Sequence, residues 1–194
     1  MLFDLRNDGH PDCYSWPVIG SGNAFLVLDR DADHVIDSGD ELFGNWTPLP
    51  GQAAPPTRKD NDWNGFLALA AYDLPTNGGD LDGVLDKDDA IWSKLKLWID
   101  THCALTPSQP CSARRSELHA LEEFGITSIS LTYEGSSKVD AYGNVFRFAS
   151  RVNPAIDTDN PNSYSTGKSH HRSYATQKSA DGRWAYDVYL QTKQ

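Results

Sequence analysis

Residues 29–41 read DRDADHVIDSGDE and directly follow an apolar run at residues 25–28 that predicts a β-strand. A calcium loop of twelve residues takes oxygen ligands from alternating positions, a backbone carbonyl at position seven and an acid near position twelve. Aspartates occupy positions one, three and five of this stretch, and further acids stand at positions nine, twelve and thirteen. The predicted calcium ligands of this stretch, loop two, are Asp29, Asp31, Asp33, Val35 through its carbonyl, Asp37, Asp40 and Glu41.

Loop two departs from the usual calcium-loop pattern at one position. His34 stands at position six, where glycine normally makes the sharp turn. We expect His34 to adopt a positive φ at a cost of about 1 kcal/mol, which histidine tolerates better than most residues. Ile36, at position eight, is expected to anchor the loop in the core.

A second acidic stretch, loop three, has its acids between Asp80 and Asp89. Aligned with a calcium loop, it starts at residue 78 and has Gly83 at its sixth position. Its first position falls on Gly78, which has no side-chain oxygen. We therefore expect Asp73, which precedes an insertion at residues 74–79, to supply the first ligand. The predicted ligands are Asp73, Asp80, Asp82, Val84 through its carbonyl, Asp86 and Asp89. The alternative is an aspartate-rich hairpin turn that binds no metal.

A third stretch, loop one, begins at Asp4 and has the same spacing. Its candidate ligands are Asp4, Asp8, His10 through its carbonyl and Asp12. Arg6 places a cation at the third position, where a calcium loop needs an oxygen. Loop one is therefore the weakest of the three candidate sites, and the alternative is a turn that keeps only the shape of the loop.

Loop four, residues 100–117, begins and ends like a calcium loop but is too long. Asp100 and Glu117 are 17 positions apart, where a twelve-residue loop needs about eleven. The extra residues fall between Cys103 and Cys111, and we predict a disulfide between these two cysteines in place of a bound ion. A disulfide favours an oxidising compartment, although Cys13 is then left without a partner. The alternative is a pair of unrelated thiols.

The charge of the chain is concentrated in its first half. The 194 residues include 27 acids and 17 bases, and the formal net charge is −10. Residues 1–100 hold 18 acids and 7 bases, whereas residues 101–194 hold 9 acids and 10 bases. Of the acids, 22 are aspartate, the residue favoured in turns and in hard-cation sites. This balance argues against a nucleic acid or an anionic membrane surface as a partner.

Composition and hydropathy indicate a folded domain without a membrane span. Apolar residues make up 39% of the chain, and the mean hydropathy is −0.54. No apolar run approaches the roughly 20 residues that a transmembrane helix needs. The first residues show no signal peptide, so we expect either an intracellular chain or a piece of a longer secreted precursor.

Apolar spacing predicts helices at residues 66–72 and 90–99, and a short helix or turn at residues 117–125. Alternating patterns predict strands at residues 126–133 and 145–152, and a last strand closes the chain at residues 184–190. The predicted fold class is α+β. EF-hand-like calcium loops with short helices form its first half, and a small antiparallel β-sheet forms its second half.

The predicted organisation is a single module over residues 1–194. Residues 1–100 form the calcium-loop region, and residues 101–152 and 183–191 form a helix plus antiparallel strands. Residues 153–182, rich in proline, asparagine, serine and glycine, are expected to form a long loop, as are residues 47–64.

The order of these elements resembles the EF-hand-like calcium-binding module of large secreted bacterial proteins of the repeats-in-toxin and haemolysin type. The matching stretches are residues 3–9, 25–29, 36–44, 65–70, 82–86, 97–100 and 117–131, so that the resemblance covers about residues 2–152. It implies an extracellular location, secreted or at the cell surface, as part of a longer chain. Arg6, His34 and the rebuilt loop four depart from the pattern of this family.

We therefore expect a calcium-binding structural or interaction module of a secreted bacterial protein that folds or stiffens on binding Ca²⁺ and has no enzymatic activity. The expected partners are calcium ions and either a protein or a glycan. We expect neither nucleic-acid binding nor insertion into a membrane. No G-x-S-x-G, H-E-x-x-H or phosphate-binding glycine loop is present in the sequence.

Several other functions fit parts of the sequence. Glu117 with His119, or His170 with His171, could serve a hydrolase or a transition-metal site. Trp16, Trp46 and Trp63 could form a glycan-binding platform beside the acidic loops. A dockerin-like module that binds a protein partner, or a part of a secreted hydrolase or toxin, is a further alternative.

Overall fold

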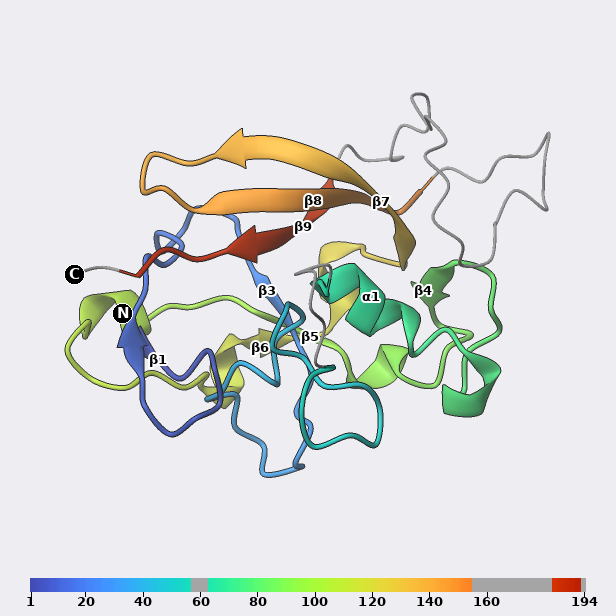
Figure 1. Cartoon of the computed structure of the whole chain (residues 1–194), viewed down its shortest axis with the longest axis horizontal. Helices are drawn as coiled ribbons and strands as arrows, with labels where there is room; N and C mark the ends of the chain where they lie inside the picture. Colours follow the sequence, from blue (N-terminus) through green and yellow to red (C-terminus); the bar gives the residue numbers. More distant parts are fainter. Residues whose placement is uncertain (57–62, 155–182, 193–194) are drawn as a thin grey trace.

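Strands dominate the computed structural model, which describes residues 1–56, 63–154 and 183–192 (Figure 1). The described strands form three antiparallel sheets. The first sheet pairs β1 (Leu2–Phe3) with β2 (Asp12–Cys13), and the second has the order β3 (Phe25–Val27), β5 (Lys96–Trp98), β6 (Leu118–His119). The third sheet has the order β4 (Val84–Asp86), β7 (Ser128–Val139), β8 (Val145–Val152), β9 (Trp184–Tyr189).

Helices contribute little to the described residues. The one α-helix is α1 (Gly65–Ala70), whose first turn is capped by the side chain of Asn64. Short 3₁₀ turns connect the strands; they are η1 (Pro75–Asn77), η2 (Trp92–Lys94), η3 (Cys103–Leu105), η4 (Arg115–Glu117) and η5 (Leu121–Phe124). The prediction of an α+β fold is therefore wrong, because the described structure is mostly β with a single six-residue α-helix.

The largest departure from the predicted elements lies at residues 90–99. The expected helix is replaced by η2 and the strand β5, and the backbone leaves the helical region at Leu95 (φ −64°, ψ 139°). Strand β5 pairs with β3 on one side and with β6 on the other. Its apolar side chains also contribute to two cores, because Leu97 packs against one cluster and Trp98 belongs to the other. Tertiary pairing thus overrides the helical spacing of the apolar residues.

Other predicted elements are confirmed. Helix α1 ends before Asp73, and β3 lies within the expected apolar run. Strands β8 and β9 occupy the expected segments. Strand β7 extends six residues beyond its predicted end at Tyr133. Gly125 ends η5 in the left-handed conformation (φ 66°). Most of the predicted loop at 153–182, and residues 57–62 of the other, lie outside the described residues.

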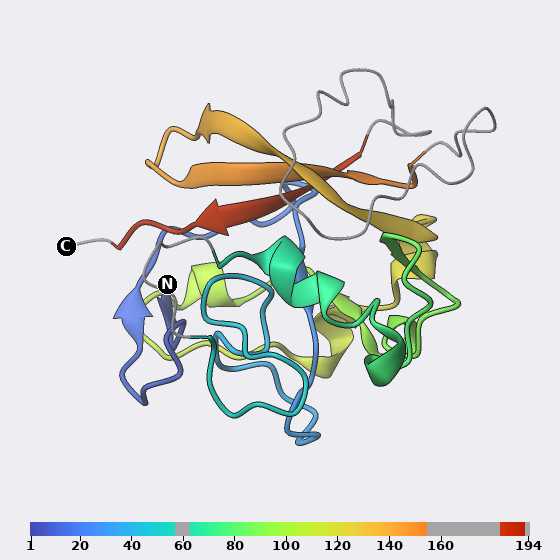
Figure 2. The same ribbon diagram turned by 45° about the vertical axis from the view of Figure 1, so that its right-hand side comes forward.

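The long strands β7, β8 and β9 form a curved sheet on one side of the molecule. Figures 1 and 2 show this sheet above α1, with the loops of the first half of the chain on the opposite side of the helix. Register shifts along both strand pairs bend the sheet. Within the described part of the chain, no helix combines the length and the apolar character that crossing a membrane requires.

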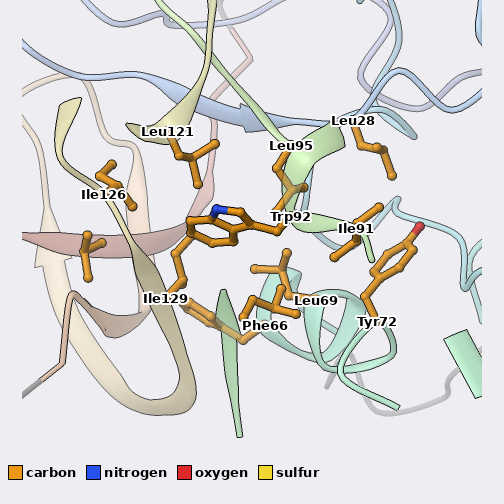
Figure 3. Packing of buried hydrophobic residues seen from close by; sticks show 12 residues of the cluster. Leu28, Phe66, Leu69, Tyr72, Ile91, Trp92, Leu95, Leu121, Ile126 and Ile129 are labelled. Atoms are coloured by element: carbon orange, nitrogen blue, oxygen red, sulfur yellow. The ribbon is translucent and has the colours of Figure 1, made fainter. Parts of the chain in front are cut away.

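The buried apolar residues form two cores. The first core lies among α1, η2, β4 and β7, and Figure 3 shows the indole of Trp92 in its middle. The second core surrounds Trp98 and contains Cys103 and Cys111. Leu85 of loop three belongs to the first core, whereas Ile36 of loop two belongs to the second. Loops two and three are therefore anchored in different cores.

Candidate functional site

Loops one, two and three share one backbone turn. In each loop the first aspartate accepts a hydrogen bond from the backbone N–H at position six, and the residue at position six has a positive φ. The bonds run from Gly9 to Asp4 (2.7 Å), from His34 to Asp29 (3.1 Å) and from Gly83 to Asp73 (3.0 Å). His34 adopts φ 70°, so the expected left-handed turn at this histidine is confirmed.

Loop two gathers four carboxylates. Oxygens of Asp29, Asp31, Asp33 and Glu41 lie within 4.8 Å of one another. Glu41 is only 4% exposed, and its Oε2 accepts a hydrogen bond from the backbone N–H of Asp37 at 2.9 Å. Its other oxygen, Oε1, and Oδ1 of Asp29 are buried and have no hydrogen-bond partner among the described residues. Buried carboxylate oxygens without a partner are costly, so this cluster has the form of a cation site.

The electrostatics of loop two agree with this interpretation. Burial, together with the nearby carboxylates of Asp31, Asp37 and Asp40, raises the pKa of Glu41 to about 7, although a hydrogen bond from the backbone of Asp37 partly offsets the rise. The neighbouring Arg30 does not neutralise the cluster, because it donates to the backbone carbonyl of Asp40 and lies over the rings of Phe43 and Tyr72.

The remaining predicted ligands of loop two lie at its edge. Asp40 accepts a hydrogen bond from Ser38 Oγ at 2.6 Å, and its carboxylate is not among the four that converge. Asp37 is exposed, and Val35 donates its backbone N–H to Asp33. Of the two acids predicted at the end of loop two, Glu41 at position thirteen joins the cluster and Asp40 at position twelve does not.

Loop three gathers three carboxylates in the same way. Oxygens of Asp73, Asp80 and Asp89 lie within 4.8 Å of one another. Asp73 and Asp89 are each 4% exposed, and the Oδ1 atoms of both have no hydrogen-bond partner in the described part of the chain. Oδ2 of Asp89 accepts from the backbone N–H of Asp86 at 2.8 Å, which matches the bond that Asp37 donates to Glu41 in loop two.

Asp73 reaches loop three because the insertion at residues 74–79 folds back on itself. The backbone carbonyl of Asp73 accepts a hydrogen bond from the backbone N–H of Leu81 at 2.9 Å. Gly79 lies so close that an added Cβ would be 2.2 Å from the carbonyl carbon of Asp73. The structure therefore brings Asp73 into the carboxylate cluster of loop three.

Burial also perturbs the acids of loop three. It raises the pKa of Asp89 to about 6, with further contributions from Asp73, Asp80 and Asp86, and it raises the pKa values of Asp73 and Asp82. The carboxylates of Asp82 and Asp86 accept backbone hydrogen bonds within the loop, from Val84 and Asp88.

Loop one carries its own cation. Arg6 lies 3.0 Å from an oxygen of Asp8 and 2.9 Å from an oxygen of Asp12. Asp4 accepts hydrogen bonds from the backbone N–H groups of Asp8 and Gly9, and His10 is exposed. The four candidate ligands keep the shape of a loop, and the guanidinium group neutralises two of the three acids.

Loop four contains the predicted disulfide between Cys103 and Cys111, whose Cα atoms are 5.5 Å apart, and Cys13 is free. Asp100 accepts hydrogen bonds from the backbone N–H groups of residues 102–104. Glu117 accepts from Thr101 and from the backbone N–H of Arg114, and its Oε1 lies 2.8 Å from His102 Nδ1. Burial alone would raise the pKa of Glu117, but these hydrogen bonds lower it to about 2.

The position of His102 between Asp100 and Glu117 was not predicted from the sequence. The only signal was its adjacency to Cys103 in a loop that begins like a calcium loop. In loops two and three, the buried acid that ends the loop has one oxygen without a partner in the described structure. In loop four, the corresponding oxygen is Oε1 of Glu117, which accepts a hydrogen bond from Thr101 and lies beside His102.

The other candidate sites are not assembled in the described residues. His119 pairs with Glu123 at 3.2 Å rather than with Glu117. Trp63 is buried, Trp16 packs against Phe3, Phe25 and Trp98, and the three tryptophans therefore do not share an exposed platform. His170 and His171 lie outside the described residues.

Comparison with known proteins identifies a family and relatives that include a bacterial protein. A family model described as SPM domain matches residues 1–163. The chain is also 33% identical over 144 residues to the iron-regulated protein FrpA of Neisseria meningitidis serogroup C. This match covers 74% of the chain and 11% of FrpA, so the chain corresponds to a small part of a much longer relative.

Proposed function

The chain belongs to the SPM domain family, and we propose that it is a calcium-binding module of a larger secreted bacterial protein, in which loops two and three each hold one Ca²⁺ ion. The resemblance to calcium-binding modules of the repeats-in-toxin and haemolysin type is part of this proposal. So is the extracellular location, which the disulfide favours.

One observation carries the proposal. Both loops end on a buried acid, Glu41 or Asp89, with one oxygen bonded to the loop backbone and the other without a partner in the described structure. Each of these two acids belongs to a cluster that also contains the first aspartate of its loop. A bound cation would satisfy these oxygens and offset the cost of burying several acids together.

Calcium fits these clusters better than other common ions. All the converging atoms are carboxylate oxygens, without a thiolate or an imidazole of the kind that transition metals select. Each loop offers three or four carboxylates on a flexible backbone, whereas Mg²⁺ is usually held by one or two carboxylates plus waters or phosphates. The residues that would hold the ion in loop two are Asp29, Asp31, Asp33 and Glu41. Those in loop three are Asp73, Asp80 and Asp89.

Calcium binding would stabilise both cores, because Ile36 and Leu85 connect the loops to them. Free calcium at about 100 times its Kd would add about 2.7 kcal/mol of stability for each occupied loop. We expect the melting temperature to fall by many degrees when calcium is removed with a chelator.

Native mass spectrometry of the folded protein tests the number of ions directly. The expected count is two for the unmodified chain, and one for each of the double variants D29N/E41Q and D73N/D89N. Asp88→Asn removes the same charge from an exposed acid that pairs with Lys87, so this control should keep two ions. A chain that binds no calcium, or double variants that keep both ions, would overturn the proposal.

A further inference from the structure

The sulfur atoms of loop four lie beside an imidazole. Sγ of Cys103, Sγ of Cys111 and a ring nitrogen of His102 are all within 4.8 Å of one another. His102 Nε2 is 3.7 Å from Cys103 Sγ, and His102 Nδ1 is 2.8 Å from Glu117 Oε1. His102 Nδ1 lies 4.0 Å from the same sulfur, so both ring nitrogens are near Cys103 Sγ, whereas only Nδ1 contacts the buried carboxylate.

The carboxylate of Glu117 positions one edge of the His102 ring. Glu117 is 1% exposed, and its Oε1 lies 2.8 Å from His102 Nδ1. When Nδ1 donates to this carboxylate, Nε2 is the nitrogen left to bind a metal, and it lies 3.7 Å from Cys103 Sγ. A histidine that binds a metal through one nitrogen while the other donates to a carboxylate is the usual arrangement in zinc proteins.

We propose that loop four becomes a zinc site when its disulfide is reduced, with Cys103, Cys111 and His102 as ligands and Glu117 as the residue that orients His102. A phosphine or dithiol supplies two electrons and is itself oxidised. The S–S bond breaks, and each sulfur takes up one proton to form a thiol. Zinc binding then releases both thiol protons, because zinc is bound by the thiolates.

The local geometry allows this change with small side-chain movements. Zn–S bonds of about 2.3 Å in a tetrahedral site place two sulfurs about 3.8 Å apart. The Cα atoms of Cys103 and Cys111 are already 5.5 Å apart on one short loop. Rotation of the two side chains, without separation of the backbone, would open the space for the ion.

The surroundings favour zinc and leave it a route to solvent. Cys103 and Cys111 are 1% and 6% exposed within the second core, whereas the side chain of His102 is 19% exposed. Thiolates and imidazole together select zinc over calcium. The oxygens of Asp100 already accept backbone hydrogen bonds, so Asp100 supports the loop rather than competing as a ligand.

Cobalt(II) is a spectroscopic substitute for zinc and allows a direct test. The full chain would be reduced with a phosphine in saturating calcium, which keeps the acidic loops occupied, and circular dichroism would record its fold. We expect one Co²⁺ per chain with a thiolate-to-cobalt charge-transfer band that zinc displaces. The oxidised protein should show no such band.

Variants assign the ligands. Cys111→Ser should abolish the band, while His102→Gln and Glu117→Gln should each weaken metal binding about 10- to 100-fold. Cys13→Ser should leave the band unchanged, since this cysteine is not part of the cluster. The proposal is overturned if folded, reduced protein gives no band, if the band depends on Cys13, or if His102→Gln binds cobalt as tightly as the unmodified chain. It is also overturned if the reduced chain unfolds in calcium and zinc does not restore its fold.

Discussion

The residue at the third position distinguishes the four loops. This residue is Asp31 in loop two and Asp80 in loop three, and in both loops its carboxylate joins a cluster with unpaired buried oxygens. It is Arg6 in loop one and His102 in loop four, and there a side chain of the protein pairs with the acids instead. One position thus separates loops whose buried acids keep unpaired oxygens within the described structure from loops in which another side chain pairs with the acids.

Glu41→Gln should have opposite effects on the calcium-free and the calcium-bound protein. The variant removes a buried charge that has one unpaired oxygen, so the calcium-free form should unfold at a higher temperature at pH 8. It also removes one calcium ligand, so calcium should raise the melting temperature by less. Thermal melts with and without calcium measure both effects. Asp40→Asn is the matched control, and equal behaviour of the two variants would contradict the role of Glu41.

Arg6→Gln should destabilise loop one without changing the number of bound ions. The substitution leaves Asp8 and Asp12 without their guanidinium partner. The resulting fall in melting temperature should be small and should shrink at high salt, because the pair is exposed and such interactions are screened. Melts at low and high ionic strength check this expectation. A change in the calcium count would show that loop one is itself a metal site.

At the scale of elements, loops two and four are joined. The backbone N–H of Ala113 donates to the carbonyl of Ile36 at 2.8 Å, and both residues lie in the second core with the two bonded cysteines. Loop three instead joins the first core through Leu85, and β4 pairs with β7. The disulfide should therefore support the shape of loop two and have little effect on loop three.

Replacing both Cys103 and Cys111 by serine should lower the stability of the calcium-bound protein by roughly 2–3 kcal/mol. It should also weaken calcium binding at loop two several-fold and leave loop three unchanged. Titration calorimetry can separate the loops when the serine pair is combined with D73N/D89N or with D29N/E41Q. An equal loss of affinity at both loops would show that the disulfide acts on the whole fold and not through Ile36 and Ala113.

The carboxylate clusters of loops two and three could be predicted from sequence because most of their acids follow a local spacing. Asp73 was also predictable, since the missing first ligand of loop three required an acid from before the insertion. The helix expected at residues 90–99 failed because β5 pairs with two strands distant in the sequence. The use of Glu41 in place of Asp40, and the position of His102 beside Glu117, depend on how the loop ends turn into the second core. Spacing alone does not encode that turn.

At the scale of the whole molecule, calcium bound as proposed would compete with protons for the same buried acids. The first half of the chain carries an excess of acids, and loops two and three draw several of them into buried clusters. Without calcium, protonation of Glu41 and Asp89 is the remaining way to reduce this repulsion, as their raised pKa values indicate. The stability of the molecule should therefore depend on pH in opposite directions with and without calcium.

The folded, calcium-free protein holds Glu41 at a pKa of about 7 and Asp89 at about 6, above their ordinary values of 4.5 and 3.8. Between about pH 4 and pH 7 the folded state thus binds more protons than the unfolded chain. Its stability should fall as pH rises through this window, by on the order of 1–3 kcal/mol for each group. Calcium needs both acids ionised, so the stabilisation that calcium provides should grow over the same window.

Scanning calorimetry at pH 5, 6, 7 and 8, in calcium-free buffer and in excess calcium, measures this competition. The gap between the two melting temperatures should be small at pH 5 and largest at pH 8. Glu117 does not disturb the comparison, because its lowered pKa of about 2 affects stability only below its ordinary value of 4.5. The variant E41Q/D89N should show a small gap at every pH. A gap that stays constant from pH 5 to pH 8 in the unmodified chain would mean that calcium binds away from Glu41 and Asp89.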